Sequence, residues 1–318
     1  MKFIIRKSID HFFERFNIIM KKQLLTLLLI FSAFALQAQD ADSVTIKKSG
    51  TWGVNFANVG LSNWAGGGES SLAIGTVFNT SIERIKGGSS WKNQFDFALG
   101  GAKVGEQDFR KTDDAIILLS QYSQQIKSDL SWSLTGILRT QLLDGNTFAA
   151  DPINIGEEIA TKISTFMAPG YLSLNLGIDK KVGEHLNISF APAAGKFTFV
   201  LDDELSDAGA YGVDPGDKIR AEFGTNFLAV LDLPIMENIS FKSTLNFFTA
   251  YDTFGNVDTN WETLLVMKVN KWFNATFGTQ LIYDDDILIA QDNGNFERKI
   301  QFKHVLNFGA NFALFSSN

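Results

Sequence analysis

A glycine-rich stretch, "NWAGGGESS" from Asn63 to Ser71, is the first candidate for chemistry in this sequence of 318 residues. Such a stretch binds phosphate when its N–H groups converge ahead of a helix and a Lys neutralises the charge. No GK[ST] follows here, and the next residues, "SLAIGTVFNTSI", alternate apolar and polar side chains as a strand does. We therefore expect a turn that Trp64 anchors, with a ligand site at Trp64 and Glu69 as the alternative. The residues concerned are Asn63, Trp64, Gly66, Gly67, Gly68 and Glu69.

Two acidic clusters are the next candidates, as weak metal sites. Neighbouring carboxylates bind Ca²⁺ or Mg²⁺ loosely, but the spacing here is not that of an EF-hand. Solvated acidic loops are the favoured interpretation, and no other cofactor is expected. The clusters are "DDEL", with Asp202, Asp203 and Glu204, and "YDDDIL", with Asp284, Asp285 and Asp286.

Histidine chemistry is limited to three residues, His11, His185 and His304. A lipid hydrolase needs a serine nucleophile beside the histidine base, and a third residue that orients the base. His304 shares its strand face with Phe302 and Leu306, but no serine lies two residues away on that face. We therefore expect no enzymatic activity, and a membrane-embedded enzyme acting on lipid is the alternative.

A secretory signal peptide is indicated by the basic pair and apolar run of "MKKQLLTLLLIFSAFALQAQD". We place it at residues 1–38, with Met20 as an alternative start. The chain has no cysteine, which excludes disulfides and thiol chemistry. Residues 1–38 hold 6 of the 28 basic and 2 of the 35 acidic residues, so the remaining chain carries a formal charge of −11. Nucleic acid is therefore not an expected partner.

Twelve segments alternate apolar and polar residues with the period of two that is typical of β-strands. Most are longer than the usual length of about 5–6 residues for soluble strands, and they suffice to cross a bilayer when tilted. The predicted strands are residues 52–60, 70–85, 91–104, 115–126, 130–142, 170–180, 186–198, 218–233, 239–251, 259–269, 272–283 and 299–315.

The connections between these strands alternate between short and long. The short ones are "KGGSS", "KSD", "KVGEH", "PIMEN" and "NK", and the intervening ones are longer. Outer-membrane barrels combine short periplasmic turns with longer extracellular loops, whereas a soluble sandwich has no reason to do so. The sequence therefore predicts an all-β fold, a transmembrane outer-membrane β-barrel of about 12 antiparallel strands. We assign residues 50–318 to the barrel and residues 39–49 to a short periplasmic segment.

Side-chain parity assigns residues to the two faces of the predicted wall. One face is expected to contact hydrocarbon, with Phe95, Phe97, Leu99, Leu172, Leu174 and Leu176. Charged residues of the opposite face are expected in the lumen, where they either fill it with ion pairs or line a narrow polar passage. They are Glu83, Lys92, Asp96, Arg139, Asp179, Arg220, Glu222, Asp232, Lys242, Glu262, Lys268 and Lys303.

The last strand is similar to the assembly signal of bacterial outer-membrane barrels. Asn307, Gly309, Phe312 and Leu314 occupy its polar, glycine, aromatic and apolar positions. This similarity implies the barrel-assembly machinery as a partner during biogenesis. Outer-membrane lipid and lipopolysaccharide are the other expected partners, and the oligomeric state is left open.

The "NWAGGGESS" stretch, with "TWGVNF" before it and "WKNQFDFALGGAKV" after it, resembles the domain of unknown function 3078 (DUF3078), an uncharacterised family of Bacteroidota proteins. The likeness covers most of residues 50–318, and Asn63, Trp64 and the glycines are its specific part. It implies an exported barrel and no substrate. We expect a narrow or plugged passive pore or a structural envelope protein. The alternatives are the lipid-acting enzyme and a surface module that binds a ligand or partner through acidic extracellular loops.

Overall fold

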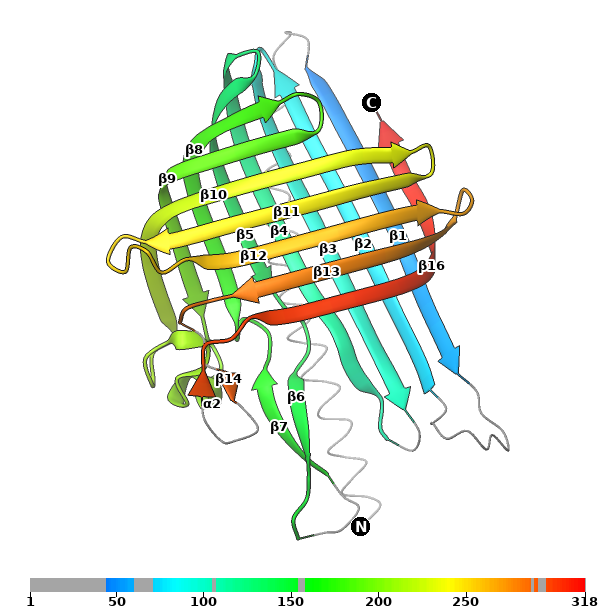
Figure 1. Ribbon diagram of the computed structural model, residues 1–318, viewed down its shortest axis with the longest axis vertical. Coiled ribbons are helices and arrows are strands. Elements are labelled where there is room, and N and C mark those ends of the chain that lie inside the picture. The colour runs from blue at the N-terminus through cyan, green and yellow to red at the C-terminus, as the bar shows by residue number, and fades with distance from the viewer. Residues whose placement is uncertain are drawn as a thin grey trace. The chain divides into compact units, whose positions relative to one another are not determined.

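Twelve long strands make up most of the chain (Figure 1). The structure is a computed structural model that describes residues 44–59, 71–104, 107–153, 158–286, 289–290 and 296–317. These residues belong to one compact unit, Val44–Asn318, so the predicted signal peptide lies outside them. Within these ranges, no helix is long and apolar enough to cross a membrane.

The strands pair in antiparallel register and close into a barrel, because β1 (Thr45–Val59) pairs with β16 (Gln301–Ser317). Closure leaves no exposed sheet edge, which matters in hydrocarbon, where each unsatisfied backbone group costs several kcal/mol. The other barrel strands are β2 (Ser71–Lys86), β3 (Ser89–Val104), β4 (Arg110–Lys127), β5 (Leu130–Thr140), β8 (Gly170–Val182), β9 (Leu186–Phe199), β10 (Ile219–Met236), β11 (Ile239–Ala250), β12 (Asp258–Lys268) and β13 (Phe273–Tyr283).

The predicted barrel of twelve antiparallel strands is confirmed, with one clear difference at its first strand. β1 begins at Thr45, well before the predicted residue 52, and Lys47 and Lys48 are already in register with β2. The polar segment "TIKKSG" lacks the apolar alternation by which the other strands were recognised. A strand end outside the hydrocarbon needs no such alternation, so hydrophobic periodicity underestimates its length.

Short turns join the strands at one end of the barrel, the turn end, and the longer connections lie at the other, the loop end. At the turn end, Gly87 and Gly88 connect β2 to β3 with φ values of 54° and 80°. A two-residue hairpin turn with positive φ at both positions favours glycine, because a side chain would be strained there. The predicted alternation of short turns and long loops is therefore present in the structure.

Small elements at the loop end interrupt connections that were predicted as plain loops. Figure 1 shows the β6–β7 hairpin projecting beyond the barrel strands, with α2 and β14 at the same end. A compact apolar cluster joins Leu205 of α2 to Ala168, Val200 and Val213. The elements are β6 (Gly145–Ala150), β7 (Glu158–Ser164), α2 (Asp203–Asp207), the 3₁₀ turn η1 (Ala210–Gly212), β14 (Ile289–Ala290) and β15 (Phe296–Glu297).

The outer face of the barrel is apolar. Leu174 and Leu176 of β8 expose 44% and 49% of their surface, and Phe95 of β3 packs its ring 6.0 Å from that of Phe78 on β2. On this face Trp52, Trp91 and Trp261 donate their N–H groups to hydroxyl oxygens, and the bond from Trp261 to Ser243 is 3.0 Å long. A continuous exposed band of this kind is stable only against lipid.

Candidate functional site

Polar side chains meet across the lumen of the barrel. Arg139 of β5 and Glu262 of β12 form an ion pair with 2.9 Å between Nη2 and Oε1, although their strands are not neighbours in the sheet. Only side chains that point into the lumen can make such a contact. The ion pair therefore shows which face of β5 and which face of β12 is the inner one. Asn260 and Gln280 also donate hydrogen bonds to the Glu262 carboxylate, which fixes its position.

A second ion pair also joins strands that are not neighbours. Lys303 of β16 lies 3.4 Å, measured from Nζ, from a carboxylate oxygen of Asp113 on β4. These two side chains are 50% and 49% exposed, and those of Arg139 and Glu262 are 37% and 38% exposed. Solvent therefore reaches the lumen around both ion pairs.

Six charged side chains near the loop end form what we call the mouth cluster. Lys196 lies at its centre, with Nζ 2.6 Å from Asp258 Oδ2, 3.0 Å from Asp284 Oδ2 and 3.6 Å from Glu222 Oε2. The Lys196 side chain is only 15% exposed. Because a buried unpaired charge is costly, the three carboxylates are what keep this ammonium in place. The members of the mouth cluster are Lys196, Arg220, Glu222, Asp258, Asp284 and Asp286.

Arg220 extends the mouth cluster to the loops. Its Nη2 lies 3.2 Å from Glu222 Oε1 and 2.5 Å from Asp286 Oδ2, while Nη1 donates to the carbonyl oxygen of Gly212 at 3.4 Å. Gly212 has a φ of 76°, and a Cβ there would lie 2.7 Å from Arg220 Nη1. The mouth cluster thus connects β9, β10 and β12 to η1 and to the segment after β13.

Lys196 is a lumen residue that side-chain parity does not predict, because β9 contains a bulge. Around residues 191–193 the register of β9 against both neighbours shifts by one residue. Phe190 therefore faces outward at 51% exposure, whereas Lys196 faces inward, although both are even-numbered. Pro192 and Gly195 were the available signals, because proline and glycine inside a strand often mark a bulge.

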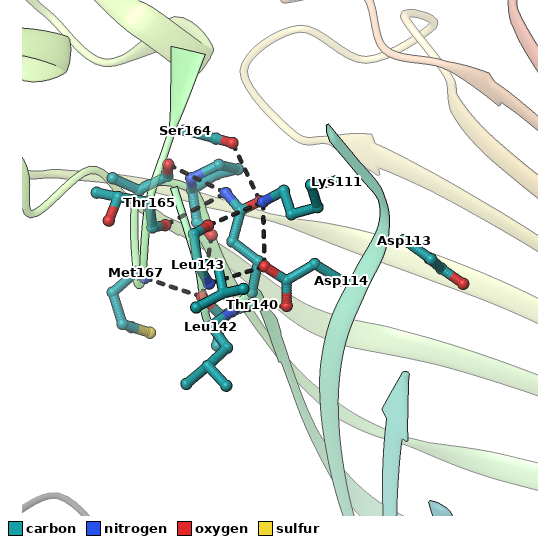
Figure 2. A network of polar contacts seen from close by, with 12 residues as sticks. Lys111, Asp113, Asp114, Thr140, Leu142, Leu143, Ser164, Thr165 and Met167 are labelled. Carbon is teal, nitrogen blue, oxygen red and sulfur yellow. Dashed lines mark hydrogen bonds and ion pairs between the residues drawn. The ribbon is translucent and has the colours of Figure 1, made fainter. Parts of the chain in front are cut away.

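A separate polar network holds the connection between β5 and β6 at the loop end (Figure 2). The Asp114 carboxylate accepts hydrogen bonds from the backbone N–H groups of Leu142 and Leu143 at 2.9 and 2.8 Å, and pairs with Lys111 at 3.0 Å. Figure 2 shows Asp113 apart from these contacts, on the other side of the β4 ribbon. The two neighbouring aspartates thus have different roles: Asp113 lies in the lumen, and Asp114 holds the loop.

Replacing Asp114 with alanine is expected to release residues 141–143 at a cost of about 1.5–3 kcal/mol, the usual worth of hydrogen bonds to a charged group. The side chain is only 1% exposed, so water cannot replace it without rearrangement. Hydrogen exchange of the Leu142 and Leu143 amides should accelerate. Asp108→Ala, an exposed acidic residue in the connection before β4, is the control and should leave both amides protected. Unchanged exchange in Asp114→Ala would contradict the assignment.

The first predicted acidic cluster is paired with lysines. Lys162 of β7 lies 2.8 Å from Asp202 and 3.1 Å from Glu204, and Lys218 lies 2.6 Å from Asp203. Asp202 also caps α2, because its side chain accepts a hydrogen bond from the Leu205 N–H. The hydrogen bond from Lys162 lowers the pKa of Asp202 below its ordinary value of 3.8. These residues therefore fasten α2 to the β6–β7 hairpin.

The contact between Lys162 and Asp202 is expected to depend on pH. A lowered pKa in the folded state means that the contact stabilises the fold above the ordinary value of 3.8 and that this contribution is lost as the pH falls through the lowered pKa. Limited proteolysis should therefore cut the hairpin faster in acid. The Asp202→Asn variant should be cleaved at the same rate above pH 3.8 and below the lowered pKa of Asp202. Cleavage of the wild type at a rate that does not change, relative to Asp202→Asn, as the pH falls from 6 through the lowered pKa of Asp202 would refute the assignment.

A polar cavity of about 280 Å³ lies between β1, β2 and β3. Asp96 lies on its wall and accepts hydrogen bonds from Asn79 and Gln94 at 2.9 and 2.6 Å. In the sheet register Asp96 is opposite Ile117, which is opposite Arg139, so it shares the inner face with Arg139. Space for several water molecules therefore exists within the lumen. The lining residues are Ser49, Gly50, Thr51, Asn79, Thr80, Ser81, Lys92, Gln94 and Asp96.

The remaining predicted lumen residues are placed by the same register argument. Asp179 accepts a hydrogen bond from the inward Gln121. Glu83 lies opposite Lys92, Asp232 opposite Lys242, and Lys268 shares the parity of Glu262 on β12. Asn63, Trp64, Gly66, Gly67, Gly68 and Glu69 lie outside the described residues.

The second acidic cluster is split by the structure. Asp284 and Asp286 join the mouth cluster, whereas Asp285 between them pairs with Arg298. The three aspartates are adjacent in the sequence, but no local pattern links them to Asp258, which lies 26 positions before Asp284 at the start of β12. Contacts of this range follow from barrel closure and not from local spacing.

Closed strands, an apolar outer band and a polar interior with cross-lumen ion pairs define the class of this protein: it is a transmembrane β-barrel of the bacterial outer membrane. Within this class, the model of the family described as "Protein of unknown function (DUF3078)" matches residues 56–146, which confirms the predicted resemblance over that part of the chain. The predicted likeness was broader, over most of residues 50–318. No curated protein matches the chain.

Several solved barrels are similar in outline. The translocator domain of the autotransporter NalP from Neisseria meningitidis has 10% identity and a TM-score of 0.36, covering 92% of this chain and 95% of its own. An outer membrane channel from Pseudomonas putida F1 has 9% identity and a TM-score of 0.38, covering 88% and 100%. The Pseudomonas putida toluene transporter TodX has 11% identity and a TM-score of 0.36, covering 86% and 89%. At these values the neighbours indicate nothing about the activity of this chain.

Proposed function

We propose that the protein is a narrow passive pore whose loop end is constricted by the mouth cluster. The observation that carries the proposal is the pair of cross-lumen contacts, Arg139 with Glu262 and Lys303 with Asp113, whose side chains are 37–50% exposed. A collapsed interior would bury these charges, whereas a water-filled lumen leaves them solvated. Charged groups that meet in the lumen also set the ion selectivity of a pore.

The mouth cluster supports the second half of the proposal. Its side chains are much less exposed than the two lumen pairs, with 15% for Lys196 and 8% for Glu222. The charged side chains are therefore packed most closely on the side of the loop end that β9, β10 and β12 form. We infer slow passage of small polar solutes or ions and no catalytic step. The position of His304 supports the second of these inferences, the lack of a catalytic step. Its ring lies beside the Phe302 ring, with 6.0 Å between the ring centroids, on the apolar face of β16.

The partners we propose follow from the apolar outer wall of the barrel and from its last strand. The apolar band fits the lipid of the outer membrane, and lipopolysaccharide in the outer leaflet would surround the loop end, which we take as extracellular because the longer loops lie there. The barrel-assembly machinery is proposed to act on the last strand, β16, which contains Asn307, Gly309, Phe312 and Leu314.

Single-channel conductance of the purified protein in a planar bilayer tests the proposal. We expect small unitary steps for the wild type and larger steps when the Arg139–Glu262 pair is removed by R139M together with E262M, because this pair crosses the lumen. Ser131→Ala, an inward residue opposite Asp179 near the turn end, is the matched control. If neither the wild type nor the double variant conducts, the pore proposal fails and a structural role is favoured.

A further inference from the structure

We propose that the mouth cluster binds one divalent cation, Ca²⁺ in preference to Mg²⁺, between Glu222, Asp258 and Asp286. One carboxylate oxygen from each of these residues lies within 4.8 Å of the other two. Oxygens on opposite sides of a Ca²⁺ ion are about 4.6–5.2 Å apart, because Ca–O distances are about 2.3–2.6 Å. Separations of up to 4.8 Å between the three oxygens are therefore compatible with one Ca²⁺ ion bound between them.

The preference for Ca²⁺ follows from the stricter requirements of the smaller ion. Mg²⁺ holds its oxygens at about 2.0–2.1 Å, so two opposite ligands are only about 4.2 Å apart. Mg²⁺ also releases its water reluctantly and demands near-octahedral geometry. Glu222 and Asp258 lie on strands of a closed sheet, so these two ligands cannot move together around a smaller ion as easily as ligands on one loop.

An unsatisfied oxygen in the mouth cluster points independently to a ligand. Glu222 is 8% exposed, and its Oε2 is buried without any hydrogen-bond donor. Arg220 occupies the other oxygen of the same carboxylate, Oε1. Lys196 stays 3.6 Å from Oε2, beyond hydrogen-bonding distance, because it donates to Asp258 and Asp284. A buried carboxylate oxygen left without a donor is destabilising, and a cation would satisfy it.

The charge balance of the mouth cluster also favours a bound divalent cation. The mouth cluster holds four carboxylates, Glu222, Asp258, Asp284 and Asp286, but only two cations, Lys196 and Arg220. With all six ionised, the net charge is −2, which one divalent cation neutralises. Surplus buried charge of this size is costly in a partly dehydrated site. An ion would thus complete the site and tie the segment after β13 to β10 and β12.

Calcium titration of the full chain tests this inference. Protein purified in detergent, stripped with EDTA and desalted, is titrated with CaCl₂ by isothermal calorimetry, with MgCl₂ in a parallel run. We expect saturable binding of one Ca²⁺ per chain and weaker binding of Mg²⁺. Glu222→Gln should weaken Ca²⁺ binding roughly 100-fold, since even changes beyond the ligands themselves cost roughly 10–100-fold in metal affinity.

The controls separate this site from the other acidic loop. Asp203→Asn, whose side chain on α2 is 93% exposed, should bind Ca²⁺ as the wild type does. Heat-modifiable gel mobility reports whether each variant has assembled, and Asp258→Asn replaces Glu222→Gln if the latter does not fold. Absence of saturable binding in the wild type, wild-type affinity in an assembled Glu222→Gln or Asp258→Asn, or loss of binding in Asp203→Asn would each overturn the inference. The titration requires no conduction, so its outcome is independent of the proposed pore.

Discussion

Replacing Lys196 with methionine is expected to destabilise the barrel by about 3–5 kcal/mol and to widen its loop end, because removing one partner from a buried ion pair leaves the opposite charges uncompensated. Three carboxylates, those of Asp258, Asp284 and Glu222, lie within 3.6 Å of the ammonium. Without it they repel one another. The segment after β13 can move away, since Asp284 lies outside the barrel strands.

Two measurements check this expectation. Urea unfolding in lipid vesicles reports the free energy of unfolding, and planar-bilayer recording should show larger unitary steps than the wild type. Lys180→Met is the matched control, because Lys180 is 59% exposed and lies 4.0 Å from Asp129 at the turn end. An exposed pair of this kind contributes about 0–1 kcal/mol. Equal free energies of unfolding for Lys196→Met and Lys180→Met would contradict the central role assigned to Lys196 in the mouth cluster.

The fold was predictable because a barrel wall imposes one simple rule along the chain. Each strand must alternate lipid-facing apolar residues with inward polar ones. A segment such as "WKNQFDFALGG" can therefore be recognised as a strand from its own sequence, without reference to any other segment. The alternation of short turns with long loops then distinguishes an outer-membrane barrel from a soluble sandwich. Both signals are local, and both were confirmed in the closed sheet.

The candidate site was only partly predictable because it depends on contacts across the lumen. Parity placed Arg139 and Glu262 on inner faces, but nothing local indicates that residues 123 positions apart form an ion pair. Lys196 required knowledge of the bulge in β9, since a single extra residue reverses the parity of every later residue in the strand. The loop residues that complete the mouth cluster, Asp284 and Asp286, are positioned by irregular backbone that carries no periodic signal.

A single arginine on the lipid-facing wall should be almost as damaging as loss of Lys196. Leu176 lies at the middle of β8 and exposes 49% of its surface on the outer face. Leu176→Arg is expected to cost about 2–4 kcal/mol, the value for a cation near the bilayer midplane. Urea unfolding in lipid vesicles, followed by tryptophan fluorescence, measures this change.

The neighbouring residue provides the control that gives this experiment its meaning. Asn175 precedes Leu176 on the same strand and lies opposite Thr135 of β5 on the inner face. Asn175→Lys adds a cation at nearly the same depth but within the polar lumen, so its cost should be small. A large difference between the two variants is expected only if parity separates lipid from lumen at this point of β8. Equal costs would mean that the outer face of β8 does not contact hydrocarbon there, and the predicted wall residues Leu172 and Leu174 would lose their assignment with it.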